Sequence, residues 1–252
     1  MTARTTTRTT ARIDAQQARR LLALGRDLAP AASVSDVVDV LAAGVGAKPM
    51  AGVATCFTAA GTPAWDAVAP DARLTRDALG DRLDAANLDW HLTPVEDVRT
   101  VDEEITWYEL LVSAAPDAIP RFLDAAGTEP SARTEREYGE ALGYPDSAVD
   151  WFVSHPVEAT EGSVFDVISE RYEGDDAVTL AASVPYVPAP TLRGASDAIE
   201  DGRALAGALG RLDASAERDA LAEPLLGERI RETLATYDQR RAWRDPLSRA
   251  MG

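Results

Sequence analysis

Two short segments hold the side chains best suited to bind a ligand. The first comprises the turn Gly143-Tyr144-Pro145-Asp146 and the nearby His155. The second is the proline-rich segment 185–193, which carries Tyr186 and Arg193. Aromatic rings, a carboxylate, a guanidinium and an imidazole are groups that orient small ligands. We therefore expect a binding site where the two segments meet, formed by Tyr144, Asp146, His155, Tyr186 and Arg193.

The sequence excludes several kinds of metal and redox chemistry. One cysteine, Cys56, cannot form a disulfide within the chain or a cysteine-based zinc or iron–sulfur site. Two histidines, His91 and His155, are too few for a three-histidine metal site. We find no P-loop, Gly-x-Ser-x-Gly, His-Glu-x-x-His or EF-hand pattern. No metal and no cofactor are therefore predicted, and Cys56 is expected to be a buried, inert thiol within a strand.

A hydrolase or transferase is the second hypothesis, with carboxylates and His155 as its reactive groups. The chain has 42 acidic residues, and neighbours such as Glu103-Glu104 are typical of a solvated surface. General acid catalysis needs a carboxyl group whose pKa is raised by its surroundings. No pattern in the sequence marks one of these carboxyl groups in that way.

The charge of the chain is strongly negative and its cations are almost all arginine. The net charge is −17, and Lys48 is the single lysine among 25 basic residues. This composition resembles that of proteins from salt-loving archaea, and it predicts an acidic surface that repels itself at low salt.

Both ends of the chain are rich in arginine, which makes an RNA-associated protein the third hypothesis. DNA reading by residues 145–154 is not expected, because that segment has acidic residues and no Lys or Arg.

We expect a cytoplasmic protein without a membrane anchor. The first residues, MTARTTTRTTAR, lack the apolar stretch of a secretory signal. No segment approaches the roughly 18 apolar residues of a membrane span.

Hydrophobic periodicity and capping residues predict an α+β protein with a helical C-terminal half. The sheet is expected to be small and mixed, and ferredoxin-like if a strand at 178–184 completes it. The predicted strands are 50–58, 88–92, 105–113 and 178–184; the predicted helices are 14–28, 34–46, 74–86, 116–126, 134–142, 145–154, 196–212 and a long helix from Pro224.

The expected organisation has three parts, which are a disordered tail at 1–12, an α/β part at 13–126 and a mainly helical part at 127–252. The last two could share one domain. The alanine- and leucine-rich C-terminal helices could bury either an internal core or the contact of a homodimer.

The stretch from Tyr138 to Phe152 resembles an uncharacterised archaeal domain family. That family has a Leu-Gly-Tyr-Pro turn followed by a cysteine pair, and a later Pro-His-x-Pro-Cys segment that leads into a helix. Here Leu142-Gly143-Tyr144-Pro145 matches the turn, and Pro185 to Ala189 matches the later segment. The resemblance covers residues 130–212.

The departures from this family lie at its cysteine and histidine positions. The cysteine pair falls on Ser147 and Ala148, the later cysteine on Ala189, and the histidine on Tyr186. The resemblance therefore implies a shared fold without any cysteine-dependent function. The leading hypothesis is a salt-adapted, cytoplasmic binding or interaction module that takes an unknown protein or small molecule and lacks the cysteine site of its relatives.

Overall fold

The computed structural model describes residues 13–29, 32–58, 61, 75–99, 104–127, 131–155, 163–172, 175–216 and 220–250. The tail predicted at 1–12 lies outside these residues. Across the described ranges, no helix combines the length and the apolar character that a bilayer crossing requires.

Three antiparallel strands form the sheet, in the order β1-β3-β2. They are β1 (Met50–Thr58), β2 (Asp89–Arg99) and β3 (Glu104–Ser113). The α+β class is confirmed, but the sheet is antiparallel throughout and not mixed. The segment predicted as a fourth, ferredoxin-like strand lies mostly in helix α8 (Asp175–Ala182), because its small residues pack on α9 (Leu192–Ser215). The predicted strand 88–92 is the first half of β2, which continues past Pro94 through an irregularity of register.

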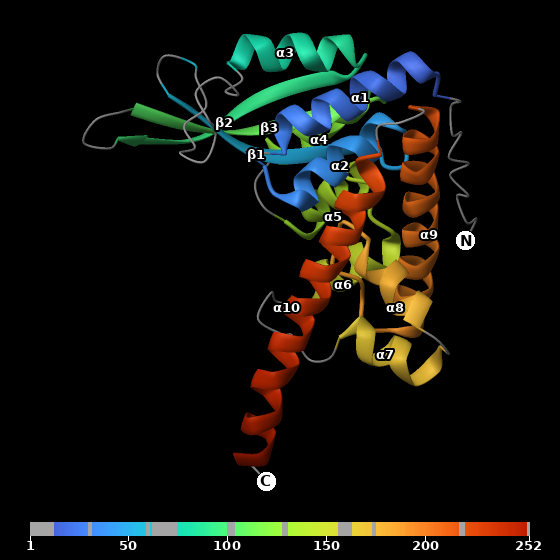
Figure 1. Cartoon of the computed structure of the whole chain (residues 1–252). Helices are drawn as coiled ribbons and strands as arrows, with labels where there is room; N and C mark the ends of the chain where they lie inside the picture. The colour runs from blue at the N-terminus through green and yellow to red at the C-terminus, as the bar shows by residue number, and fades with distance from the viewer. Residues whose placement is uncertain are drawn as a thin grey trace.

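Helices α1 (Ala15–Leu28), α2 (Val34–Gly44) and α3 (Arg76–Ala85) cover one side of the sheet (Figure 1). Their starts follow from side-chain caps. Asp14 accepts a hydrogen bond from the Gln17 amide, and Ser33 forms a reciprocal capping box with Asp36. These caps confirm the predicted starts of the first two helices. Helices α2 and α3 contact the strands directly, and α1 packs on α2 and α3.

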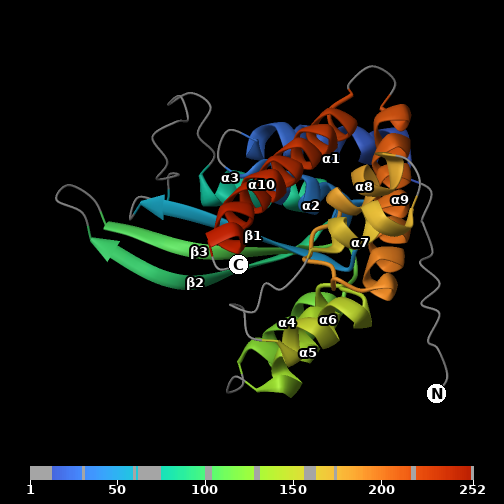
Figure 2. The same cartoon turned by 90° about the horizontal axis from the view of Figure 1, so that it is seen from below.

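On the opposite side lie α4 (Ala118–Ala126), α5 (Ala132–Ala141) and α6 (Asp146–Ser154), as Figure 2 shows. Helix α5 begins two residues earlier than its predicted start at Thr134. Ser131 is its N-cap, and Thr134 supplies the returning hydrogen bond of the capping box. Two residues that can cap a helix, Ser131 and Thr134, lie three positions apart, so the sequence left the start of this helix ambiguous. Helix α6 follows Pro145 and ends at Ser154 as predicted.

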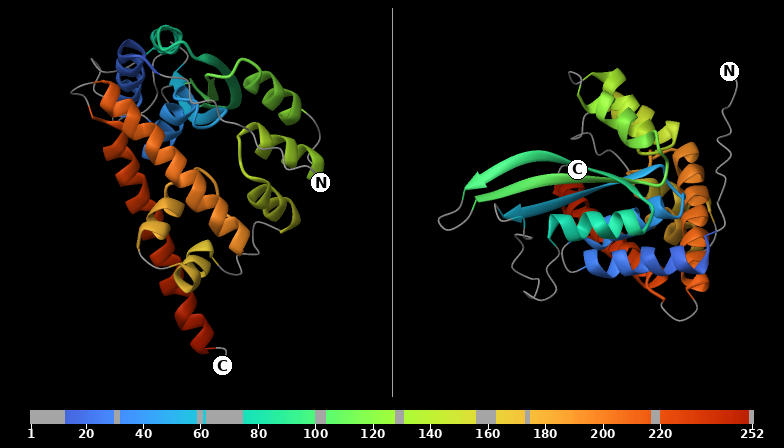
Figure 3. Two further views of the ribbon diagram at one scale, coloured as in Figure 1. Left: turned by 90° about the vertical axis from the view of Figure 1, so that its right-hand side faces the viewer. Right: turned by 90° about the horizontal axis from the view of Figure 1, so that it is seen from above.

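The C-terminal half contains α7 (Val164–Arg171), α8, α9 and α10 (Ala222–Ala250). Helices α9 and α10 diverge from a shared corner, and the C-terminal part of α10 projects from the body (Figure 3). At that corner the buried Asp213 carboxylate accepts hydrogen bonds from the amides of Leu221, Ala222 and Glu223. Helix α9 begins after its cap Thr191, and not at Ser196 as expected. The connector 185–193 is correspondingly shorter than predicted.

Buried apolar side chains form three clusters. The largest joins α1, α2 and one sheet face to α9 and α10, and Leu41, Leu110 and Leu209 are among its fully buried members. A second lies among α7, α8 and the start of α9, and a third joins the other sheet face to α4 and α5. The largest cluster therefore draws on both of the parts into which the sequence was divided.

Candidate functional site

The Gly143-Tyr144-Pro145 turn is fixed by its contact with the loop before β1. Gly143 has φ of +78°, in the left-handed region that glycine adopts without penalty. A Cβ atom at this position would lie 2.3 Å from Cδ of Pro49. The sequence therefore needs glycine here twice, for backbone conformation and for close approach. The result is that Tyr144 lies beside the segment that carries Lys48.

Tyr144 and Tyr186 meet as the sequence predicted that their segments would. Their ring centroids are 5.4 Å apart, and both side chains are half-buried. The Tyr186 hydroxyl donates a hydrogen bond of 2.9 Å to Asp201. Burial, followed by the charge of Asp39, raises the pKa of Tyr144 to about 12. The Tyr144 phenol thus keeps its proton over the whole physiological range.

Asp146 and Arg193 lie at the exposed rim of this junction. Arg193 approaches Asp146 at 3.7 Å and Asp197 at 3.8 Å. The hydroxyl of Ser147 lies 2.5 Å from a carboxylate oxygen of Asp197. Ion pairs as exposed as these contribute little to stability. Arg193 is therefore available to attract an anion without a large cost to the fold.

His155 lies apart from these four residues. It follows α6 at the end opposite to Asp146, about 13 Å away along a helix of this length. Its ring stacks on Trp151 with centroids 3.5 Å apart, and its Nδ1 lies 3.0 Å from the Trp151 carbonyl oxygen. These contacts close the last turn of α6. They account for His155 as a helix-end residue.

A buried ion cluster, which no sequence pattern had indicated, lies next to the tyrosine pair. Lys48 Nζ is 3.0 Å from one carboxylate oxygen of Asp39, and Arg229 donates to the other at 2.8 Å. Arg229 also donates to the Val184 carbonyl at 3.0 Å, two residues before Tyr186. The side chains of Lys48 and Arg229 are each 6% exposed, and that of Asp39 is 16% exposed.

We call the group formed by Asp39, Lys48, Tyr144, Tyr186 and Arg229 the seam, because residues of all three apolar clusters border it. Tyr144 packs on the third cluster, Tyr186 packs on the second, and Asp39 lies on α2 of the first. The seam holds two cations and one carboxylate. Burial lowers the pKa of Lys48, and the attraction of Asp39 opposes this shift without cancelling it.

The signal that could have pointed to this cluster was the single lysine. In a chain whose other cations are all arginine, Lys48 is the one that can lose its proton. Asp39 and Arg229 carried no comparable signal, since 190 residues separate them and each is one of many of its type.

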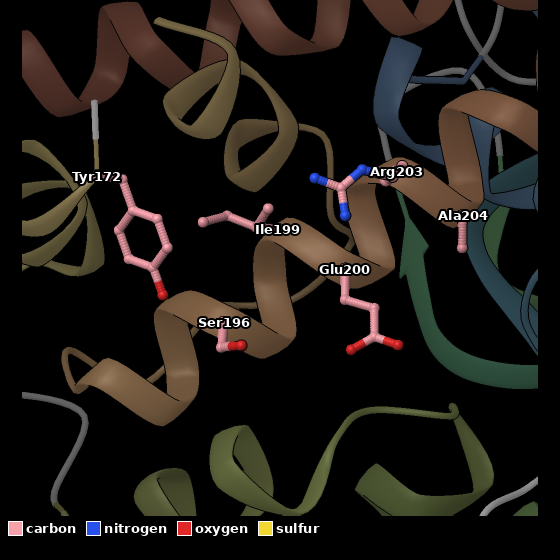
Figure 4. Close-up of a pocket in the computed structure, with 6 residues that line it drawn as sticks. All are labelled: Tyr172, Ser196, Ile199, Glu200, Arg203 and Ala204. Atoms are coloured by element: carbon pink, nitrogen blue, oxygen red, sulfur yellow. The ribbon is translucent and has the colours of Figure 1, made fainter. Parts of the chain in front are cut away.

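A separate surface hollow of about 560 Å³ lies along α9 (Figure 4). Tyr172 faces the helix from the end of α7, and the polar lining groups on α9 are exposed. None of the five predicted residues lines it, and its lining is Tyr172, Ser196, Ile199, Glu200, Arg203 and Ala204. An open hollow of exposed groups offers less desolvation than the seam, so we place the candidate site at the seam.

The described residues contain no group of three or more His, Cys, Asp or Glu arranged to hold a metal ion. Cys56 lies on β1, and its side chain is outside the described part of the structure.

Three comparisons with known proteins found no matching family model, curated protein or solved structure. The similarity of the Gly-Tyr-Pro segment to an archaeal family therefore stays a prediction. What the structure defines is an α+β protein with an ion cluster buried where its three apolar clusters meet.

Proposed function

We propose that this protein is a salt-adapted, cytoplasmic binding module whose seam takes a small molecule with a carboxylate group. The observation that carries the proposal is the excess of positive charge in the seam. Two cations that are almost wholly buried share the single carboxylate of Asp39. An anion that enters the seam would balance this charge and accept hydrogen bonds from the Lys48 ammonium.

The overall charge of the protein favours anion binding at the seam over binding elsewhere on the surface. A chain of net charge −17 repels anions over most of its surface. Molar salt screens charges that are exposed to water, but it screens buried charges much less. An anion ligand is therefore bound where cations are buried, and Arg193 at the rim supports its approach.

The two tyrosines supply the apolar part of the proposed site. Their rings lie close to the cations and contact each other, tilted by 47°, at the junction of α6 and the α8–α9 connector. A small ligand would contact these rings while its carboxylate approaches Lys48. Both residues are half-buried, so part of their surface is accessible to a ligand.

The test is the melting temperature of the full chain in molar KCl with added potassium acetate, pyruvate or succinate. The reference is the same total concentration of potassium supplied as chloride. We expect at least one carboxylate to raise the melting temperature of the wild type. The rise should shrink in Tyr186→Ala and Arg193→Ala, and should persist in Arg211→Ala, an exposed arginine elsewhere on α9. Equal shifts in all variants, or no shift with any carboxylate, would contradict the proposal.

The other sequence-based hypotheses stay predictions. The contacts of His155 with Trp151 and Ser154 give no specific support to a hydrolase or transferase. The side chains of the arginine-rich C-terminus lie outside the described residues, so an RNA contact has no structural support here. A protein partner or a homodimer, the lack of DNA binding, and the cysteine-lacking relationship to the archaeal family likewise rest on sequence.

A further inference from the structure

The surface hollow along α9 is lined largely by one face of that helix. Ser196, Glu200 and Arg203 follow one another at intervals of four and three residues, the spacing that places side chains on the same face. Tyr172, at the end of α7, faces this stripe from across the hollow (Figure 4). The volume of about 560 Å³ lies within the range of roughly 300–1,000 Å³ that is typical of small-molecule sites. The hollow is therefore large enough for a ligand of the size of an amino acid.

The hollow presents one positive and one negative charge that are not paired with each other. Within the described part of the chain, the exposed side chains of Arg203 and Glu200 take part in no ion pair or hydrogen bond. A simple anion would be attracted by Arg203 but repelled by Glu200, and a simple cation would meet the reverse. A ligand that carries both charges can pair with both side chains. Its zero net charge also avoids repulsion by a protein of net charge −17.

The hollow also has an apolar part. Ile199 lies between Tyr172 and Arg203 in Figure 4, and both Ile199 and Tyr172 pack in the second apolar cluster. An apolar side chain that contacts these two residues is removed from water without displacing either charged group.

We propose that this hollow binds a free α-amino acid with an apolar side chain. The carboxylate of the ligand pairs with Arg203, and its ammonium group pairs with Glu200. The apolar side chain contacts Ile199 and Tyr172. The site is separate from the seam, so this inference does not depend on the function proposed above. Because the charged groups of the hollow are exposed, each ion pair with the ligand contributes modestly and binding is weak.

The experiment measures the dissociation constants of leucine, leucinamide and N-acetylleucine by saturation-transfer NMR of the ligand methyl signals. The full-length protein is used at pH 7 in the lowest KCl concentration that keeps it folded, because salt screens exposed charges. Leucinamide lacks the carboxylate and N-acetylleucine lacks the ammonium group, so each of them retains one of the two ion pairs. The variants are Arg203→Gln and Glu200→Gln. Arg211→Gln and Glu228→Gln are the controls, since both residues are exposed and do not line the hollow.

We expect Arg203→Gln to weaken the binding of leucine and N-acetylleucine by about two- to fivefold, as for the loss of an exposed ion pair. The same substitution should not weaken leucinamide, since it removes a cation that repels the ammonium group. Glu200→Gln should show the opposite pattern and weaken leucine and leucinamide but not N-acetylleucine. The control variants should bind all three ligands as the wild type does. Leucine should bind more tightly than alanine, because alanine covers less of Ile199 and Tyr172.

Several results would overturn the inference. One is the absence of saturable leucine binding, and another is equal affinity for leucine and alanine. Equal effects of Arg203→Gln on all three ligands would show that the residue acts on the fold and not on the ligand carboxylate. Leucine binding that is lost in Tyr186→Ala but retained in Arg203→Gln would place the ligand at the seam, which would support the function proposed above and not a site in the hollow.

Discussion

At the scale of single residues, the charge balance of the seam depends on Asp39. This carboxylate pairs with two cations from other parts of the chain, Lys48 and Arg229. Removal of Lys48 leaves a balanced pair of Asp39 and Arg229. Removal of the Asp39 charge leaves two buried cations without a carboxylate. Loss of Lys48 therefore makes the cluster neutral, whereas loss of the Asp39 charge increases its net positive charge.

Asp39→Asn is therefore expected to destabilise the protein far more than Lys48→Met. Loss of one partner of a buried ion pair costs about 3–5 kcal/mol when it strands a charge. Lys48→Met, which strands none, should cost about 1 kcal/mol. Denaturant unfolding in molar KCl measures both free energies of unfolding. Equal losses would show that the cluster is no less stable with two unpaired cations than with the Asp39–Arg229 pair, contrary to this charge balance.

Tyr144 gives a second prediction at this scale, on the alkaline side of the pH range. Its pKa is about 12 in the folded protein against 10.0 for an unperturbed tyrosine. Between these values the unfolded chain has lost a proton that the folded protein retains. The contribution of Tyr144 to the free energy of unfolding is thus fully present below pH 10 and is lost as the pH rises toward 12.

Tyr144→Phe should lessen this alkaline loss by roughly 2–3 kcal/mol, at about 1.4 kcal/mol for each pKa unit. The measurement is the free energy of unfolding of both proteins at several pH values from 8 to about 12. Tyr138, whose pKa burial also raises, is present in both proteins and so cancels in the comparison. Parallel pH profiles would mean that Tyr144 is not desolvated.

At the scale of elements, Gly143 and Gly46 can be compared because they share a backbone conformation but differ in their surroundings. Both have positive φ, +78° and +69° respectively. A Cβ at Gly143 would collide with Pro49, whereas a Cβ at Gly46 would meet nothing within 4 Å. The two glycines separate the cost of backbone conformation from the cost of close packing.

Gly46→Ala should cost about 1–2 kcal/mol, the penalty of a left-handed alanine. Gly143→Ala should cost clearly more, since the turn must also move away from Pro49. Urea unfolding gives both values, and a carboxylate-induced melting shift reports whether Tyr144 has moved. Similar losses of stability would indicate that the loop before β1 can move away from an added Cβ atom at little cost in free energy.

The elements were largely predictable from sequence, and the reasons are local. Asp14, Ser33 and Pro145 act on their own helices through contacts within a few residues. The error at 178–184 arose because a short apolar run suits either a strand or a buried helix. Its helical state depends on α9, where Gly202 admits the Leu180 carbonyl so closely that a Cβ would lie 2.0 Å from it.

The candidate site was predictable in part. The meeting of Tyr144 with Tyr186, and of Asp146 with Arg193, follows from two segments whose composition differs from the rest of the chain. The ion cluster joins α2, the loop before β1 and α10, and no local pattern links such distant positions. Sequence spacing also placed His155 near the turn, but helix α6 carries it away from Asp146.

At the scale of the whole molecule, the net charge of −17 sets the dependence of stability on salt. Most of these charges are exposed to water, whereas those of the seam are buried. The repulsion between exposed charges extends over a screening length of about 10 Å at 0.1 M salt and about 3 Å at 1 M. The melting temperature should therefore rise steeply up to about 1 M KCl and more slowly beyond it. For a chain of this size, each kcal/mol of relieved repulsion raises it by about 2–4 °C.

A variant with fewer exposed acids separates this screening from other effects of salt. Amides can replace the exposed carboxylates Asp81, Asp124, Glu140, Glu170, Glu228 and Glu232, which come from five different helices. The variant should melt higher than the wild type in about 0.1 M KCl and converge with it in molar KCl, because only unscreened repulsion is removed. Parallel salt profiles would show that KCl stabilises the fold through hydration or ion binding, and the charge excess would then serve solubility alone.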